Sequence, residues 1–158
     1  IPRGGAGGFT AYLPEQDRYY MTKSKMEAQL VTLLGGRVAE ALVLKDISTG
    51  AQNDIERATK LARQMVTHYG MSEKLGPMTY GTDDEEIFVG RDFGRTRNYS
   101  EEVAAAIDRE MRSLIDKAYS KAEQLLKENM DKLHRVAEAL LEKETLDAKE
   151  FEEIFASA

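Results

Sequence analysis

One carboxylate, Asp54, has a position from which it could do chemistry. Residues 51–69 show helical periodicity, and on a helical wheel Asp54 falls within the apolar arc. That arc contains Ala51, Ile55, Ala58, Leu61, Ala62, Met65, Val66 and Tyr69. A carboxylate on a buried face must be paired with a cation, hydrogen-bonded or bound to a metal, because an isolated buried charge is too costly. Two interpretations stay open: a first-turn Asp that bonds free backbone amides, which this segment alone favours, and a metal ligand.

Arg37 and Glu40 raise the same question in the preceding helical segment. Arg37 projects into the apolar stripe and Glu40 borders it, at the i,i+3 spacing that suits an ion pair. A structural ion pair is the simpler interpretation of these two residues.

The chain has two histidines, His68 and His134, and both lie at or on the apolar side of expected helices. We predict that they are packing residues rather than metal ligands. They are too far apart in sequence to form the one-turn zinc pair of a His-Glu-x-x-His motif.

The glycine-rich run from Gly4 to Gly8 does not predict a phosphate site. It lacks the Lys-Ser/Thr of a P-loop and leads into an expected strand rather than a helix. Glycines beside a strand instead allow another backbone to approach an open sheet edge. The kinase-like tripeptide Asp92-Phe93-Gly94 has no accompanying catalytic loop and carries no prediction.

Composition excludes several classes of function. The 22 Lys and Arg against 28 Asp and Glu give a net charge of -6, which argues against a nucleic-acid partner or a basic membrane-binding face. The absence of cysteine excludes disulfides, Cys-built metal sites and thiol catalysis. No apolar run approaches the roughly 18 residues of a membrane-spanning helix. Because the chain begins with Ile1 rather than Met, we expect it to be part of a longer protein.

The elements that must position these residues are predicted to be mainly helical. Residues 1–20 predict a glycine loop, a short strand from Phe9 to Leu13, and a turn. Thr22 is expected to cap a helix to about Leu44, in which Gly35-Gly36 costs about 1 kcal/mol per glycine unless something approaches that backbone closely. A capping box of Thr49 and Gln52 predicts a second helix to about Tyr69, ended by Gly70.

The remaining chain predicts a loop and three helices. Residues 71–99 are expected to be a mobile loop, and Ser100 to cap a long helix. We predict that this helix and the next, around residues 130–141, form an antiparallel hairpin. A capping box of Asp147 and Glu150 predicts a short terminal helix that docks through Phe151, Ile154 and Phe155. The expected fold is a single, mainly α domain over residues 1–158, with a short edge strand near its N-terminus and a C-terminal helical hairpin.

Several motifs in this order resemble those of one family. They are Gly7-Gly8-Phe9-Thr10 with Leu13-Pro14 and Asp17-Arg18, Leu34-Gly35-Gly36-Arg37 with Ala39-Glu40, Ser48-Thr49-Gly50-Ala51 with Asn53-Asp54, Ala62-Arg63 with Met65-Val66, and the run from Gly70 to Pro77. Together they resemble the FtsH family of membrane-anchored, ATP-dependent zinc metalloproteases. The resemblance covers essentially the whole chain and implies a mainly helical peptidase domain joined to an AAA+ ATPase module.

The resemblance implies roles for particular residues. In that family zinc is held by the two histidines of His-Glu-x-x-His and by an Asp that matches Asp54, which becomes the expected third zinc ligand. Glu40 is then expected near the site, where it orients or hydrogen-bonds a ligand without binding the metal itself. The strand at Gly7, Gly8, Phe9 and Thr10 resembles the edge on which the substrate backbone lies.

The resemblance also implies parts outside this chain. The His-Glu-x-x-His, with two zinc ligands and the general base, is expected on a helix that precedes Ile1. The ATPase module, with its ATP and Mg²⁺, and the membrane anchor are expected there as well. We therefore interpret the chain as the C-terminal larger part of the peptidase domain, inactive alone. The intact protein would degrade unfolded and membrane polypeptides, with this domain on the cytoplasmic, stromal or matrix side.

The resemblance finally implies a homo-oligomer, a closed hexameric ring. The wide apolar arcs of residues 22–44 and 103–126 offer more apolar surface than one small domain readily hides, so we expect some of it at subunit boundaries, with Leu42, Val43 or their neighbours. The alternative is a non-catalytic helical oligomerisation module. The sequence preceding Ile1 distinguishes the two, because the protease hypothesis requires His-Glu-x-x-His there.

Overall fold

The computed structural model describes residues 20–81 and 99–156, and within these ranges the chain is helical without strands, as the mainly α prediction requires. The elements are α1 (Lys23–Ala39), the π turn η1 (Glu40–Leu44), the 3-10 turn η2 (Thr49–Ala51), α2 (Gln52–Thr67), α3 (Glu101–Glu128), α4 (Met130–Lys143) and α5 (Ala148–Ala156). The predicted edge strand, with Gly7, Gly8, Phe9 and Thr10, lies outside the described residues. In the described ranges no helix is both long and apolar enough to cross a membrane.

The first helix begins and ends where the sequence predicts. The Thr22 Oγ1 accepts a hydrogen bond from the backbone N–H of Lys25 at 3.3 Å, which satisfies one of the free donors of the first turn. The helix widens into the π turn η1 over its last five residues and stops at Lys45, which has a left-handed backbone (φ 53°). A Cβ built on Gly35 or Gly36 would have no described atom within 4 Å, so no described residue makes the close approach that this pair permits.

The second helix starts through a different cap from the one predicted. Ser48, not Thr49, is the capping residue, because its Oγ accepts from the backbone N–H of Gly50 at 3.1 Å and opens the turn η2. Thr49 therefore lies inside the 3-10 turn and forms no capping box with Gln52. The Gln52 side chain instead donates to Glu56 Oε1 at 2.9 Å.

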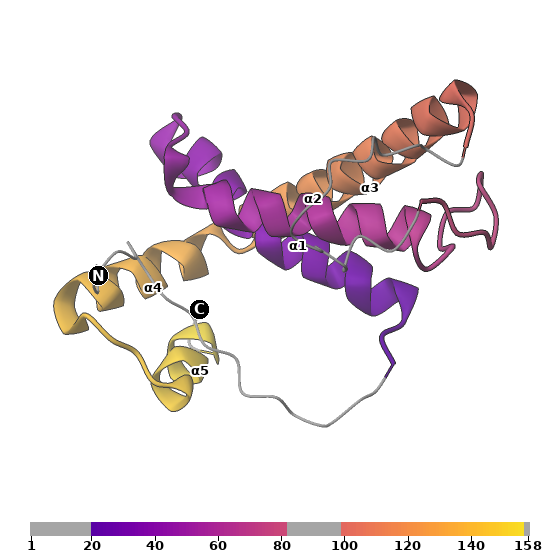
Figure 1. The fold of residues 1–158 in the computed structure, drawn as a ribbon. Helices are drawn as coiled ribbons and strands as arrows, with labels where there is room; N and C mark the ends of the chain where they lie inside the picture. Colours follow the sequence, from indigo (N-terminus) through magenta and orange to yellow (C-terminus); the bar gives the residue numbers. More distant parts are fainter. Residues whose placement is uncertain (1–19, 82–98, 157–158) are drawn as a thin grey trace, which may run out of the picture.

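The core lies between α1, α2 and α3, which pack side by side (Figure 1). Its buried residues come from all three helices: Met26, Leu30, Leu33 and Leu34 of α1, Ala58, Ala62 and Met65 of α2, and Ala118 of α3. The small side chains of α2 and α3 allow these helices to approach closely, since the distance between helix axes depends on the residues at the contact. This unit holds α2, and with it Asp54, in place.

The segment after α2 is a loop, as predicted, and residues 71–81 of it are tied to the three-helix unit. Ser72 is buried and its Oγ donates to Glu110 Oε2 of α3 at 2.8 Å, while Lys74 Nζ lies 2.9 Å from Glu110 Oε1. The pKa of Glu110 is lowered, mainly by the hydrogen bond from Lys74. Desolvation raises this pKa, and the hydrogen bond from the Ser72 hydroxyl lowers it further. Residues 82–98, which form the larger part of the expected mobile loop, lie outside the described residues.

A C-terminal helical hairpin is present, but the predicted pairing of its helices was wrong. A single residue, Asn129, separates α3 from α4, and α4 continues away from the junction instead of folding back (Figure 1). Antiparallel helix pairs need a connection of about 2–5 residues, and one residue allows only a bend. The helices that do pair are α4 and α5, since Lys143 Nζ lies 2.6 Å from Glu150 Oε1 and Lys132 Nζ lies 4.5 Å from the Phe155 ring centroid.

The terminal helix α5 has the predicted capping box. The backbone N–H of Glu150 donates to Asp147 Oδ1 at 2.8 Å, and the backbone N–H of Asp147 donates to Glu150 Oε2 at 3.0 Å. Docking through aromatic residues is only partial, because Phe151 and Phe155 stack on each other and stay 43% and 41% exposed.

The apolar face predicted for α4 is largely uncovered by described residues. Leu140 and Leu141 are 36% and 81% exposed, because α3 does not run alongside them.

Candidate metal centre

Asp54 lies in the first turn of α2, and the expectation that it is buried was wrong. Its side chain is 47% exposed, and Oδ1 lies 3.6 Å from Arg57 Nη1 on the next turn. Ala51 and Ala58, one turn before and one turn after Asp54, are both buried, whereas the Asp54 side chain is not. Asp54 therefore lies at the margin of the helix face that packs on the core.

The surroundings of the Asp54 carboxylate leave its oxygens available to a cation. Among the described residues no N–H or O–H group donates a hydrogen bond to it, so the backbone-capping interpretation is not realised there. An exposed ion pair such as the one with Arg57 contributes about 1 kcal/mol or less. Carboxylate oxygen is an accepted zinc ligand. Asp54 thus fits as one ligand of a zinc site, although residues 20–81 and 99–156 contain no group of three His, Cys, Asp or Glu that could complete it.

Glu40 joins the end of the first helix to the turn that starts α2. Its Oε1 accepts from the Ser48 Oγ at 2.5 Å, and its Oε2 accepts from the Ser48 backbone N–H at 3.4 Å. Arg37 Nη1 lies 3.7 Å from Glu40 Oε2, with the two side chains only 18% and 22% exposed, which confirms the predicted ion pair. The pKa of the Glu40 carboxyl is lowered, first by the hydrogen bond from the Ser48 hydroxyl and then by the one from the Ser48 backbone N–H. Desolvation raises this pKa, and the charge of Arg37 lowers it by a smaller amount.

Ser48 is the residue of this region whose role the sequence interpretation missed. In the sequence Ser48 stands only as part of a family motif, whereas in the structure its hydroxyl both caps η2 and donates to Glu40. One signal was available: Ser stands directly before Thr49-Gly50-Ala51, and Ser is among the strongest N-cap residues. Its partnership with Glu40 depends on the turn between the helices and has no local sequence pattern.

The two histidines are not packing residues, contrary to the prediction. His68 is the C-cap of α2 and is exposed, with its ring edge-to-face against Tyr69 at a centroid distance of 5.1 Å. His134 is exposed on α4, because the helix face on which it lies is not covered by α3. In the described part of the chain neither histidine joins Asp54 in a group of three potential ligands.

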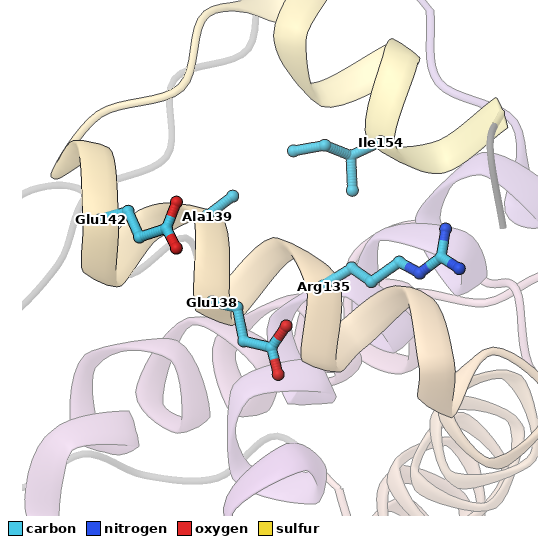
Figure 2. Close-up of a pocket in the computed structure, with 5 residues that line it drawn as sticks. All are labelled: Arg135, Glu138, Ala139, Glu142 and Ile154. Carbon is cyan, nitrogen blue, oxygen red and sulfur yellow. The ribbon is translucent and has the colours of Figure 1, made fainter.

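A shallow cleft lies away from these residues, between α4 and α5. Its volume is about 250 Å³, and Figure 2 shows Ile154 of α5 facing α4 across it. The α4 side is formed by Arg135, Glu138, Ala139 and Glu142. The cleft contains neither Asp54 nor Glu40 and combines charges of both signs with two apolar side chains, Ala139 and Ile154, so it does not extend the candidate metal centre.

Comparisons with known proteins agree on one family. Residues 1–154 match the model of peptidase family M41. The chain is 71% identical over 155 residues to a protein named ATP-dependent zinc metalloprotease FtsH 1 from Thermoanaerobacter sp. (strain X514), a match that covers 98% of this chain and 25% of that protein. It is 66% identical over 154 residues to ATP-dependent zinc metalloprotease FtsH from Caldicellulosiruptor bescii, again over 98% of this chain and 25% of the relative. The chain thus spans about a quarter of the length of the curated relatives that it matches.

Proposed function

The chain belongs to peptidase family M41, and we propose that it is the part of an ATP-dependent zinc metalloendopeptidase in which Asp54 supplies the third zinc ligand. The observation that carries this proposal is the Asp54 carboxylate itself. It lies half-exposed on a helix fixed in the core, with one weak ionic contact and no hydrogen bond from a described donor. A carboxylate in these surroundings can exchange Arg57 for a metal ion at little cost.

The residues of this chain would hold the metal in a simple way. Asp54 binds in its ionised form, and Arg57, whose side chain is 59% exposed, turns toward solvent when a cation takes its place. Glu40 keeps the turn before α2 in position through Ser48 and does not bind the metal. When bound, zinc lowers the pKa of a coordinated water and polarises the carbonyl of the scissile bond.

The other parts of the active site are proposed outside the described residues. The two histidine ligands and the glutamate base belong to a His-Glu-x-x-His on a segment that precedes Ile1. Gly7, Gly8, Phe9 and Thr10 form the strand edge against which the substrate backbone lies, since glycine lets a second backbone approach closely.

The whole protein is proposed as a membrane-anchored protease that degrades unfolded and membrane polypeptides. Its ATPase module uses ATP and Mg²⁺, and the peptidase domain lies on the cytoplasmic, stromal or matrix side of the membrane. The relatives named ATP-dependent zinc metalloprotease support this proposal.

The protease is further proposed to be a homo-oligomer, a hexameric ring. Support comes from apolar side chains at the end of the first helix. Leu42 is partly buried, whereas Val43, Leu44 and Ile47 are 42%, 68% and 63% exposed. Such a cluster on a surface is typical of an interaction site.

Substitution of Asp54 tests the proposed function. In the intact protease, Asp54→Asn should abolish zinc binding and casein degradation, because the neutral amide is a poor zinc ligand, while ATP hydrolysis persists. Asp131→Asn is a matched control, since Asp131 is also an acidic residue in the first turn of a helix, α4. If the Asp54 variant retains zinc and cleaves peptides normally, Asp54 is not a zinc ligand and is only a surface residue of α2.

A further inference from the structure

We propose that Ser48 is a positioning residue for Asp54, because its hydroxyl fixes the start of the helix that carries this carboxylate. The inference rests on the proposed function, in which Asp54 binds zinc. It concerns a residue that does not touch the metal and acts through the backbone of α2.

The Ser48 hydroxyl makes two hydrogen bonds at once. It donates to Glu40 Oε1 at 2.5 Å and accepts from the Gly50 backbone N–H at 3.1 Å. A hydroxyl has one donor and two acceptor sites, so one group joins the end of the first helix to the first turn of the next. The bond to Glu40 has an ionised acceptor, and such bonds are shorter and stronger than neutral ones.

Glu40 is itself fixed on its other side. Arg37 Nη1 lies 3.7 Å from Glu40 Oε2, and the two side chains are mostly buried. Among the described residues Arg37 Nη1 is buried without a hydrogen-bond acceptor, so the nearby Glu40 carboxylate is the group that balances its charge. The Glu40 carboxylate is therefore held in place as the acceptor of the hydrogen bond from the Ser48 hydroxyl.

The turn around Gly50 is packed against this link. A Cβ built on Gly50 would lie 3.2 Å from Ser48 Oγ and 3.7 Å from Glu40 Oε1. A methyl group at this position would press on the Ser48 hydroxyl, so the absence of a Cβ at Gly50 leaves room for the link. Loss of the Ser48 hydroxyl would open space at this point of the turn.

The position of this turn determines the position of Asp54. The chain runs from Ser48 through η2 into α2 without a break, and Ala51 between them is buried. No side chain caps α2 itself, so in the described residues Ser48 supplies the side-chain hydrogen bond that holds this end of the helix. Beyond Asp54 the helix is held by Ala58, Ala62 and Met65 in the core. Because ligand geometry must be kept within about 0.5 Å, freedom at the first turn weakens metal binding.

The test measures zinc affinity of the intact protease by equilibrium dialysis against a competing chelator. Ser48→Ala should weaken zinc binding about tenfold or more, the usual effect of removing a group that supports a metal ligand. Ser48→Thr should restore it, since Thr keeps the hydroxyl and Ser48 is exposed enough for the added methyl. Excess zinc should recover the casein hydrolysis of Ser48→Ala, because this variant keeps Asp54 as a ligand and has only a lowered zinc affinity.

A matched control separates positioning from general stability. Ser100 caps α3 in the same way, with its Oγ accepting from the Val103 backbone N–H at 3.3 Å, and α3 begins at the end of the three-helix unit opposite to η1 (Figure 1). Ser100→Ala should leave zinc affinity unchanged. If Ser48→Ala does not fold, Ser48→Gly replaces it, because Gly is well tolerated at an N-cap while also lacking the hydroxyl.

The outcomes are distinguishable. If Asp54→Asn loses zinc but the Ser48 variant without a hydroxyl binds zinc as the wild-type does, the role of Ser48 is refuted and the proposed function stands. Equal weakening by the Ser48 and Ser100 variants would also refute it, by showing a general loss of stability. If Asp54→Asn retains zinc, the proposed function itself is wrong.

Discussion

Gly70 lies two residues after the C-cap of the second helix and is under two constraints, whose sizes predict the effect of adding one methyl group. Its backbone is left-handed, with φ 58°, which side chains disfavour. A Cβ built on it would lie 2.9 Å from the Cα of Pro77 and 3.1 Å from the backbone nitrogen of Met78. Both neighbours are backbone atoms of the loop that folds back after α2, so they cannot rotate away as a side chain could.

The two constraints give separate free-energy terms for Gly70→Ala. The left-handed conformation costs a non-glycine residue roughly 1–2 kcal/mol. Displacement of packed neighbours costs about 1–3 kcal/mol, the range for inserting a methyl into a filled space. We therefore expect the free energy of unfolding to fall by about 2–5 kcal/mol, a large part of the stability of a small domain.

Two other glycines isolate these terms. Gly76 is also left-handed, with φ 73°, but a Cβ there would have no described atom within 4 Å, so Gly76→Ala should lose only about 1–2 kcal/mol. Gly35 lies within α1 with the same open space, and Gly35→Ala should stabilise the chain by about 1 kcal/mol through helix propensity.

The assay is urea unfolding of the chain followed by far-UV circular dichroism. From most to least stable, the expected order is Gly35→Ala, wild-type, Gly76→Ala and Gly70→Ala. The slope of the free energy of unfolding against urea concentration should be the same for all four. Equal losses at Gly70 and Gly76 would refute the reasoning, because the close approach of Pro77 would then add nothing. Destabilisation by Gly35→Ala would show that the open face of α1 is covered by another part of the chain.

Three further predictions concern pH, activity and assembly. Because the pKa of Glu110 is lowered in the folded state, its stabilisation is complete above the unfolded value of about 4.5 and is lost as the pH falls through the lower folded value. The stability difference between wild-type and Glu110→Gln, measured by urea unfolding, should therefore shrink on acidification below that value; a constant difference would contradict the pairing with Lys74. The 158-residue chain with added zinc should not degrade casein, since Asp54 is one ligand where a catalytic zinc needs three from protein; measurable hydrolysis would refute this. Leu44→Ser with Ile47→Ser should leave unfolding stability nearly unchanged but weaken self-association of the intact protease in sedimentation velocity; unchanged association would remove these residues from the subunit interface.

Features that depend on a few neighbouring residues were predicted well from the sequence. Thr22, Ser100 and the pair Asp147 and Glu150 cap their helices as expected, because both partners of each bond lie within a few residues of the chain. Apolar positions of α1 and α3 such as Leu30 and Ile107 are buried for a similar reason. The helical period places them on one face, and any compact packing must cover such a face.

Features that depend on where another helix lies could not be predicted in this way. The predicted arc that includes Asp54 does pack on the core at Ala51 and Ala58, but Asp54 between them lies at its margin and is half-exposed. His134 lies on an apolar side that α3 does not reach, since α3 and α4 are joined by Asn129 alone.

The candidate site shows most clearly the difference between features that depend on neighbouring residues and features that depend on another helix. The sequence by itself determined the helices, most of their caps, the ion pair of Arg37 with Glu40, and the family to which the chain belongs. Only the tertiary structure decided that Asp54 is half-exposed and that Ser48 bonds Glu40. The reason is physical: a helix and its cap are fixed by bonds between near neighbours, whereas exposure and contacts between helices depend on how the turns orient whole elements toward one another.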